Sequence, residues 1–234
     1  MAYLECTGLA AGYGGGDIIT DCNLYADLGK VSAIVGPNGA GKSTAMKAIL
    51  GLVDLSRGSV TLAGKEITQL TPQDKVAEGM AFVPQVENVF ASLTVEENLE
   101  MGAFLRKDGI AQSMQEVFDL FPVLSDFRRK KAGDLSGGQR QQVAVGRAMM
   151  TKPKILLLDE PSAGVSPIVM DDLFDMIVKV ADSGIAVMIC EQNAKQALEI
   201  ADVGFVLVQG KNRFTDSGDN LLANDQVRRS FLGG

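Results

Sequence analysis

The chain has 234 residues, of which 46% are hydrophobic, 22% charged and 6% aromatic, a composition too apolar for a disordered protein. Its 22 Lys and Arg residues against 29 Asp and Glu residues leave a net charge of −7, which argues against a broad nucleic-acid-binding face. The sequence has no histidine and only three unpatterned cysteines, which excludes the usual zinc-ligand sets and histidine-based triads. Any catalysis must therefore use carboxylates, amides, lysine or a metal.

The amino-terminus and the apolar runs argue against export or membrane insertion. The first residues carry no positive charge, and the longest apolar runs are far shorter than the roughly 18 residues of a membrane-spanning helix. Cys6, Cys22 and Cys190 fit a reducing compartment, in which thiols serve as small buried hydrophobes. We expect a single domain over residues 1–234 that does not cross a membrane by itself.

Short runs typical of β-strands alternate with longer helical patterns along the chain. This alternation predicts an α/β fold with a largely parallel core sheet. Two runs are apolar without alternation, as expected for central strands covered by helices on both faces, and these are Ile155–Leu158 and Ala186–Cys190. The other predicted strands are Val31–Val35, Ser59–Leu62, Ala81–Val83 and Gly204–Val208.

The middle of the chain is helical in pattern. Thr94 and Glu97 form a capping box that opens a helix predicted over Val95–Leu105. An apolar stripe at helical spacing follows and ends at Pro122; its members are Met114, Val117, Phe118 and Phe121. Because no strand-like run occurs in residues 92–150, we expect an inserted helical subdomain there.

A complete G-x-x-x-x-G-K-S/T run follows the predicted strand Val31–Val35 and precedes a helical stretch. Its glycines let successive backbone N–H groups point at phosphate oxygens, and the following helix adds its positive end. Lys42 would reach the β- and γ-phosphates of a bound nucleotide, and Ser43 would bind Mg²⁺. The predicted phosphate loop consists of Gly36, Pro37, Asn38, Gly39, Ala40, Gly41, Lys42, Ser43 and Thr44.

Two adjacent carboxylates end the buried strand Ile155–Leu158. Asp159 can serve Mg²⁺ through water, and Glu160 can orient and deprotonate the attacking water. An Asp-Glu pair alone would be read as a solvated strand end. The phosphate loop elsewhere in the chain favours the catalytic interpretation.

A second helix start suited to phosphate follows the helical region. Ser136 and Gln139 form a capping box, and Gly137 and Gly138 leave the first N–H groups of the helix uncovered. By itself this feature is as typical of an ordinary well-capped helix as of a phosphate-binding helix start.

Taken in chain order, the phosphate loop, the helix start at Ser136 and the carboxylate pair at Asp159 resemble Walker A, the signature turn and Walker B of an ATP-binding-cassette (ABC) ATPase. The resemblance covers essentially the whole chain. It implies a RecA-like, mostly parallel core sheet, an N-terminal antiparallel β portion and an inserted helical subdomain. Two cassettes of this family close head to tail, so that ATP on one Walker A loop is capped by the signature turn of the other. The resemblance also implies that Thr44 contacts the α-phosphate and that Tyr13 stacks on the adenine. It identifies Gln85 as the Q-loop glutamine, which binds Mg²⁺, and places Ser162 in the D-loop.

One residue departs from the family pattern. Members usually have a switch histidine just after the strand that follows Walker B, but here Gln192 occupies that place. An amide can donate a hydrogen bond to a phosphate oxygen but cannot relay a proton. The segment Glu191-Gln192-Asn193 and the ending Phe231-Leu232-Gly233 are similar to the second ATPase subunit of branched-chain amino acid importers.

The resemblance implies ATP and Mg²⁺ as cofactors and a peripheral location at the cytoplasmic face of the membrane. It implies a second ATPase subunit, which is either a histidine-bearing sister or another copy, two integral-membrane permeases and a solute-binding protein. The permeases would contact the segment Glu87–Leu105. The alternatives are a urea or short-amide importer, a soluble non-transport ABC protein, and a P-loop GTPase or kinase, although the chain has no N-K-x-D run for guanine.

Overall fold

The computed structural model describes residues 2–231, and Leu232 and Gly233 of the carboxyl-terminal ending lie outside it. The strands are β1 (Leu4–Ala11), β2 (Ile19–Ala26), β3 (Val31–Val35), β4 (Leu55–Leu62), β5 (Lys65–Glu66), β6 (Met80–Val83), β7 (Ile155–Asp159), β8 (Ala186–Glu191), β9 (Val203–Val208) and β10 (Lys211–Asp216). The helices are α1 (Lys42–Leu50), α2 (Pro72–Ala77), α3 (Val95–Gly102), α4 (Ile110–Leu120), α5 (Pro122–Asp126), α6 (Gly137–Met149), α7 (Met170–Asp182), α8 (Ala194–Glu199), α9 (Gly218–Ala223) and α10 (Asp225–Phe231).

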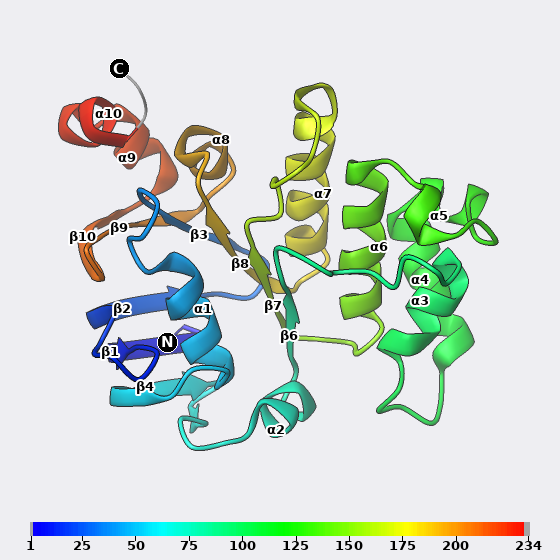
Figure 1. The fold of residues 1–234 in the computed structure, drawn as a ribbon, viewed down its shortest axis with the longest axis horizontal. Coiled ribbons are helices and arrows are strands. Elements are labelled where there is room, and N and C mark those ends of the chain that lie inside the picture. Colours follow the sequence, from blue (N-terminus) through cyan, green and yellow to red (C-terminus); the bar gives the residue numbers. More distant parts are fainter. Residues whose placement is uncertain (1, 232–234) are drawn as a thin grey trace.

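A six-stranded sheet with the order β10-β9-β3-β8-β7-β6 forms the centre of the molecule (Figure 1). The pairs β3–β8, β3–β9, β7–β8 and β6–β7 are parallel, and only β9–β10 is antiparallel. Every residue of β3, β7 and β8 is buried, as expected for strands covered on both faces. The predicted α/β fold is thereby confirmed, and β7 and β8 are buried strands as predicted. The centre of the sheet is formed by β3 and β8, however, and β7 lies next to the edge strand β6.

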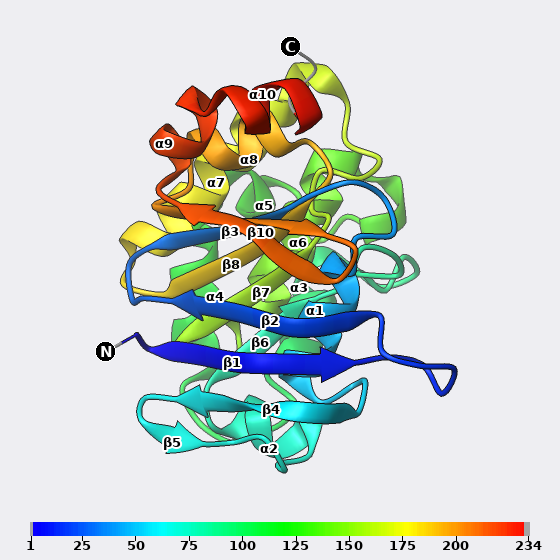
Figure 2. The same cartoon turned by 90° about the vertical axis from the view of Figure 1, so that its left-hand side faces the viewer.

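A second, antiparallel sheet has the order β2-β1-β4-β5 and lies beside the core sheet (Figure 2). It confirms the N-terminal antiparallel portion. The side chain of Asn212 on β10 joins the two sheets, because its Oδ1 accepts from the N–H of Asn23 on β2 at 2.7 Å and its Nδ2 donates to the carbonyl of Asn23 at 2.9 Å.

Two apolar layers cover opposite faces of the core sheet. Helix α1 packs with the antiparallel sheet on one face, against side chains that include Ile34 and Met188. Helices α6, α7 and α8 pack on the other face, against Val35 and Ile189. The alternation of neighbouring strand residues between the two layers follows from the period of two in a strand. The helix that follows the phosphate loop and the helix that follows the signature turn therefore lie on opposite sides of the sheet (Figure 1).

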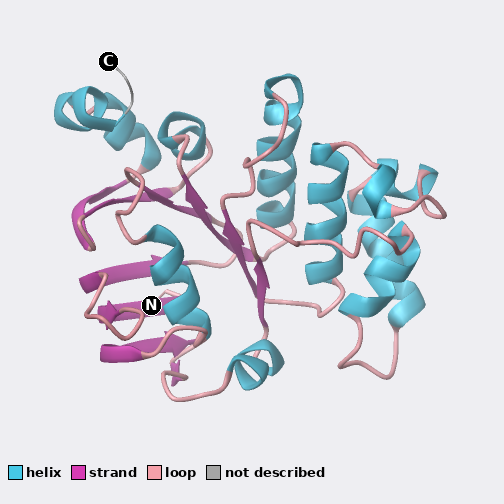
Figure 3. Cartoon of the chain, viewed as in Figure 1, coloured by secondary structure: helices cyan, strands magenta, loops and turns pink. Residues whose placement is uncertain are grey.

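The segment between β6 and β7 contains helices α3 to α6, which gather at one side of the molecule (Figure 3). Within the described chain, the only β-type pairing in this segment is an isolated bridge between Thr94 and Lys131. The capping box of Thr94 and Glu97 is present, with Thr94 Oγ1 accepting from the N–H of Glu97 at 3.2 Å. The boundaries of a subdomain at residues 92–150 stay a prediction.

The first of these helices is shorter than predicted, since α3 ends at Gly102 and not at Leu105. Gly102 lies so close to α6 that a Cβ on it would be 2.1 Å from the carbonyl oxygen of Arg147. Beyond this contact the chain turns away, and Phe104 and Leu105 are 81% and 63% exposed. The helix ends because its continuation would have no apolar layer to cover.

Candidate functional site

The candidate site is built at the carboxyl ends of the parallel strands. The phosphate loop follows β3, Gln85 follows β6, Asp159 ends β7 and Glu191 ends β8. Parallel strands bring these ends to one edge of the sheet, which is where open α/β sheets bind ligands. Residues that lie far apart in the sequence thereby become neighbours.

The phosphate loop requires glycine at two positions. Gly36 has φ 153° and Gly41 has φ 96°, values that favour glycine. A Cβ would lie 2.2 Å from the carbonyl oxygen of Leu207 at Gly36 and 2.6 Å from Cγ2 of Ile19 at Gly41. Gly41 is also the N-cap of α1, so the exposed N–H groups of that helix begin within the loop. The loop is therefore shaped by close packing against β2 and β9.

The ammonium group of Lys42 lies inside this loop. The residue is 4% exposed, and its Nζ donates to the carbonyl oxygens of Gly36 at 3.0 Å and Pro37 at 3.2 Å. Among residues 2–231, no carboxylate lies within ion-pair distance of Lys42. A buried cation held only by neutral carbonyls is suited to an anionic ligand.

Ser43 joins the phosphate loop to the strand on the far side of β8. Its Oγ donates to Oδ1 of Asp159 at 2.7 Å, and Asp159 is 4% exposed. Mg²⁺ binds hydroxyl and carboxylate oxygens and keeps several waters, so Ser43 and Asp159 are suitable protein ligands for a magnesium ion. Within the described residues no group of three or more Asp, Glu, Cys or His side chains could hold a metal. The remaining Mg²⁺ ligands would be substrate phosphates, water and the predicted Gln85.

Gln85 and Glu160 form a second long-range pair. Nε2 of Gln85 donates to Oε2 of Glu160 at 2.7 Å, and no donor in the described chain bonds to Oε1 of Gln85. That oxygen is available for a cation. Glu160 has φ 46°, an uncommon value for a residue with a side chain, and its N–H donates to the carbonyl of Cys190 at 2.9 Å. The candidate base thus sits on a tight turn anchored to β8.

A third carboxylate, Glu191, belongs to this region and was assigned no role from the sequence. It is 1% exposed, and its two oxygens accept from the N–H and Oγ of Ser162 at 2.9 and 2.7 Å and from the N–H of Gln192 at 3.2 Å. Burial raises the pKa of Glu191, and the Ser162 hydrogen bonds partly oppose that rise. The only signal in the sequence is an apolar run that ends in Glu.

The positions of Gln192 and Tyr13 carry less geometric information. Gln192 is exposed directly after β8, and its carbonyl accepts from the N–H of Ala194 at 2.9 Å. Tyr13 is 58% exposed in the loop between β1 and β2. This loop returns through Ile18, whose Cγ2 would lie 3.6 Å from a Cβ at Gly41, so it runs beside the phosphate loop. No contact in the described chain assigns Tyr13 a ligand, and its adenine role stays a prediction.

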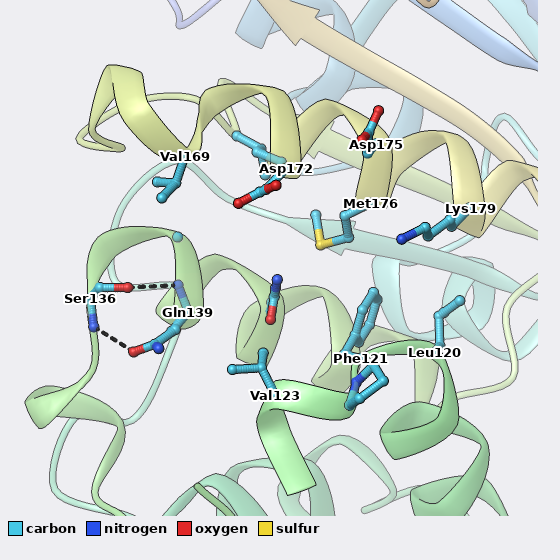
Figure 4. A pocket seen from close by; sticks show the side chains of 14 residues that line it. Leu120, Phe121, Val123, Ser136, Gln139, Val169, Asp172, Asp175, Met176 and Lys179 are labelled. Carbon is cyan, nitrogen blue, oxygen red and sulfur yellow. Dashed lines mark hydrogen bonds between the residues drawn. The ribbon is translucent and has the colours of Figure 1, made fainter. Parts of the chain in front are cut away.

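The signature turn opens α6 with the predicted capping box. Oγ of Ser136 accepts from the N–H of Gln139 at 3.3 Å, and Oε1 of Gln139 accepts from the N–H of Ser136 at 3.0 Å (Figure 4). Gly137 packs against the turn after Walker B, because a Cβ there would be 2.8 Å from the carbonyl oxygen of Gly164. A cavity of about 360 Å³ lies beside this turn, between α6, α7 and the α4–α5 corner. The core sheet separates the turn from the phosphate loop of the same chain.

This fold and these paired motifs define an ATP-binding cassette ATPase. The ABC transporter family model matches residues 19–163, which is more than half of the chain. The chain belongs to the ABC transporter family and is an ABC-type ATPase.

Curated relatives match along nearly their whole length. The high-affinity branched-chain amino acid transport ATP-binding protein BraG of Pseudomonas aeruginosa is 41% identical over 223 residues, covering 95% of this chain and 96% of the relative. The probable branched-chain amino acid transport ATP-binding protein LivF of Archaeoglobus fulgidus is 40% identical over 232 residues, or 98% of each. The lipopolysaccharide export system ATP-binding protein LptB of Haemophilus influenzae is 32% identical over 238 residues, or 100% and 98%.

A solved structure shows the same fold. The ADP conformation of an ATP-binding cassette of an ABC transporter superposes with a TM-score of 0.90 at 27% identity, covering 100% of both chains. Among residues 2–231, no helix has the length and apolar character needed to cross a membrane.

Proposed function

We propose that this chain binds Mg·ATP at the edge of its core sheet and hydrolyses the γ-phosphate to drive an importer of branched-chain or related amino acids. The observation that supports the site best is the meeting of two pairs from distant segments, Ser43 with Asp159 and Gln85 with Glu160. Walker A, Walker B and Q-loop residues thereby share one edge of the sheet. The importer assignment draws on the names of the BraG and LivF relatives.

Each residue has a distinct task in this proposal. The backbone N–H groups from Gly39 to Thr44 and the start of α1 bind the phosphates, and Lys42 neutralises their charge. Mg²⁺, held by Ser43, Asp159 and Gln85, supplies charge neutralisation at the β- and γ-phosphates when bound. Glu160 orients the attacking water and accepts its proton.

A second cassette is part of the proposal. The core sheet separates the signature turn, Ser136 to Gln139, from the phosphate loop of the same chain. In this proposal the uncovered helix start binds a nucleotide held by a second cassette. Tyr13 would stack on the adenine, and Ser162 would belong to the D-loop at the junction. Because Gln192 cannot relay a proton, we expect a heterodimer whose sister ATPase carries a histidine.

The surface proposed for the permeases lies at the Q-loop end of the helical segment. A groove of about 390 Å³ is lined by Phe90, Met101, Phe104 and Arg147, among others. Phe90 and Met101 are 45% and 47% exposed, so the groove offers apolar area to a partner. The Arg147 guanidinium lies 5.0 Å from the centre of the Phe90 ring. A short helix from a membrane subunit would fit this groove and hold the ATPase at the cytoplasmic face.

Purification of the chain from its own membranes in mild detergent, followed by mass spectrometry, tests the assembly. We expect two polytopic permeases, a histidine-bearing ATPase and a solute-binding protein that joins the complex. Lipopolysaccharide export components would instead support an exporter like that of LptB, and a binding protein specific for urea or short amides would favour those substrates. Recovery without any membrane partner would contradict the transport function and favour a soluble ABC protein.

A further inference from the structure

We propose that Glu191 is a positioning residue for hydrolysis, which holds the turn after Walker B in the geometry that Glu160 and Ser162 need. This inference rests on the proposed hydrolysis at the same site. It assigns Glu191 no contact with nucleotide. The evidence is the set of segments that its carboxylate joins.

Glu191 lies where three segments meet. In the β3–β8 pair it is opposite Val35, the residue that precedes the phosphate loop. Its carboxylate accepts both the N–H and the Oγ of Ser162, which lies two residues after Glu160. It also accepts the N–H of Gln192, at the position of the family's switch histidine. A displacement of the carboxylate would therefore break its contacts with the Ser162 turn and with Gln192.

The turn that carries Glu160 has few other anchors. The N–H of Glu160 bonds to the carbonyl of Cys190, and the turn is closed internally by the N–H of Ala163 on the carbonyl of Glu160 at 3.0 Å. Glu160 also has a positive φ, a backbone conformation that persists only where the surroundings enforce it. The two bonds from Ser162 to Glu191 supply a second attachment of this turn to β8.

Stability alone is a poor explanation for a carboxylate at this position. Glu191 is buried, and within residues 2–231 no Lys or Arg forms an ion pair with it. Burial of an anion against neutral donors opposes folding, as the raised pKa of Glu191 also indicates. A carboxylate nevertheless offers two acceptor oxygens, and three donors converge on them. A glutamine would turn its NH₂ group toward at least one of these donors.

The test is ATP hydrolysis by the complex that copurifies with the chain, at varied Mg·ATP, for Glu191→Gln, Ser162→Ala and the double variant. We expect Glu191→Gln to lower kcat about tenfold or more while the KM for ATP changes by less than about threefold. Ser162→Ala, which keeps the backbone N–H donor, should have a smaller effect. The double variant should fall little below Glu191→Gln, because both changes disrupt one contact.

Asp202→Asn is the matched control. Like Glu191, Asp202 accepts a backbone N–H, that of Val31 at 2.9 Å, but at the amino end of β3, away from the site. Asp202 also forms an ion pair with Lys30 at 2.7 Å. We expect Asp202→Asn to lower the melting temperature without a change in kcat. Thermal melts of all variants separate positioning from folding.

Three outcomes would overturn the inference. The first is a kcat of Glu191→Gln within twofold of the parent. The second is a loss of kcat, ATP affinity and melting temperature in parallel, which would make Glu191 structural only. The third is an inactive parent, or a Lys42→Ala variant as active as the parent, and only this third outcome would also overturn the proposed hydrolysis.

Discussion

Ser43 and Asp159 are 116 positions apart in the chain, yet Oγ of Ser43 donates to Oδ1 of Asp159 at 2.7 Å. The bond crosses β8, which lies between β3 and β7 in the sheet. The two oxygens that meet are those that a small divalent cation would share. This hydrogen bond therefore joins the phosphate loop directly to β7, the strand that ends in the carboxylate pair.

Asp159→Asn should raise the Mg²⁺ concentration needed for half-maximal hydrolysis at least about tenfold, because an amide oxygen carries no charge to hold the cation. Phosphate release at fixed ATP and varied Mg²⁺ measures this change. The control is Asp202→Asn, which removes a carboxylate from the far end of β3. An unchanged Mg²⁺ requirement would show that Asp159 does not serve the metal.

Glu160→Gln should slow hydrolysis by about 10²–10⁴-fold, since an amide cannot accept the proton of the attacking water. ATP binding should persist, because the phosphate loop is untouched. Single-turnover hydrolysis and equilibrium binding of ATP, measured on the same preparation, separate the two effects. Near-parent turnover would mean that the site containing Glu160 is not the one that hydrolyses ATP.

Gln192→Ala should lower turnover by roughly 10–100-fold if the Gln192 amide donates to the γ-phosphate, since a hydrogen bond to a charged group contributes about 1.5–3 kcal/mol. Gln192→His would restore both the donor and a proton carrier, so its turnover should at least match the parent. Both variants are assayed in the assembled transporter. Parent-like turnover of both variants would remove Gln192 from the hydrolysis step.

Phe104→Ser should weaken association with the permeases, because Phe104 is 81% exposed and lines the proposed docking groove. Quantitative copurification from detergent extracts measures the change. Leu28→Ser, at another exposed apolar residue outside the groove, is the control and should retain its partners. Equal recovery of permeases with both variants would place the membrane contact elsewhere.

Lys75 predicts a dependence of stability on alkaline pH. The residue is fully buried, its Nζ donates to the carbonyl of Ile49 at the end of α1 at 2.8 Å, and desolvation lowers the pKa of Lys75. The unfolded chain therefore binds more protons than the native state between that lowered pKa and the ordinary value near 10.5. Through this pH window the contribution of Lys75 to stability rises, by at most about 1.4 kcal/mol per pH unit.

Urea unfolding of the parent and Lys75→Met between pH 8 and about 10.5 checks this sign. The free energy of unfolding of the parent should gain on that of the variant as the pH rises. Subtraction of the two curves removes the contribution of other titrating groups. A constant difference across the range would contradict a lowered pKa for Lys75.

The local elements could be predicted because their causes are local. The capping boxes at Thr94 and Ser136 are present, since each depends on residues three positions apart. The buried strands β7 and β8 followed from uninterrupted apolar runs. The end of α3 was predicted wrongly because the apolar residues Phe104 and Leu105, which extended the predicted helix, are exposed and have no layer to pack against. Strand β10, with mostly exposed residues, shows no apolar run and was missed.

The sequence by itself determined the phosphate loop, the signature turn and the carboxylate pair, because each is a short run whose chemistry is complete within a few residues. Only the tertiary structure decided that Gln85 bonds to Glu160 and that Glu191 bonds to Ser162. These contacts depend on strand order and parallel register, which bring the ends of β6, β7 and β8 to one edge. Strand order follows from long-range packing, for which no short segment of the chain carries a signal.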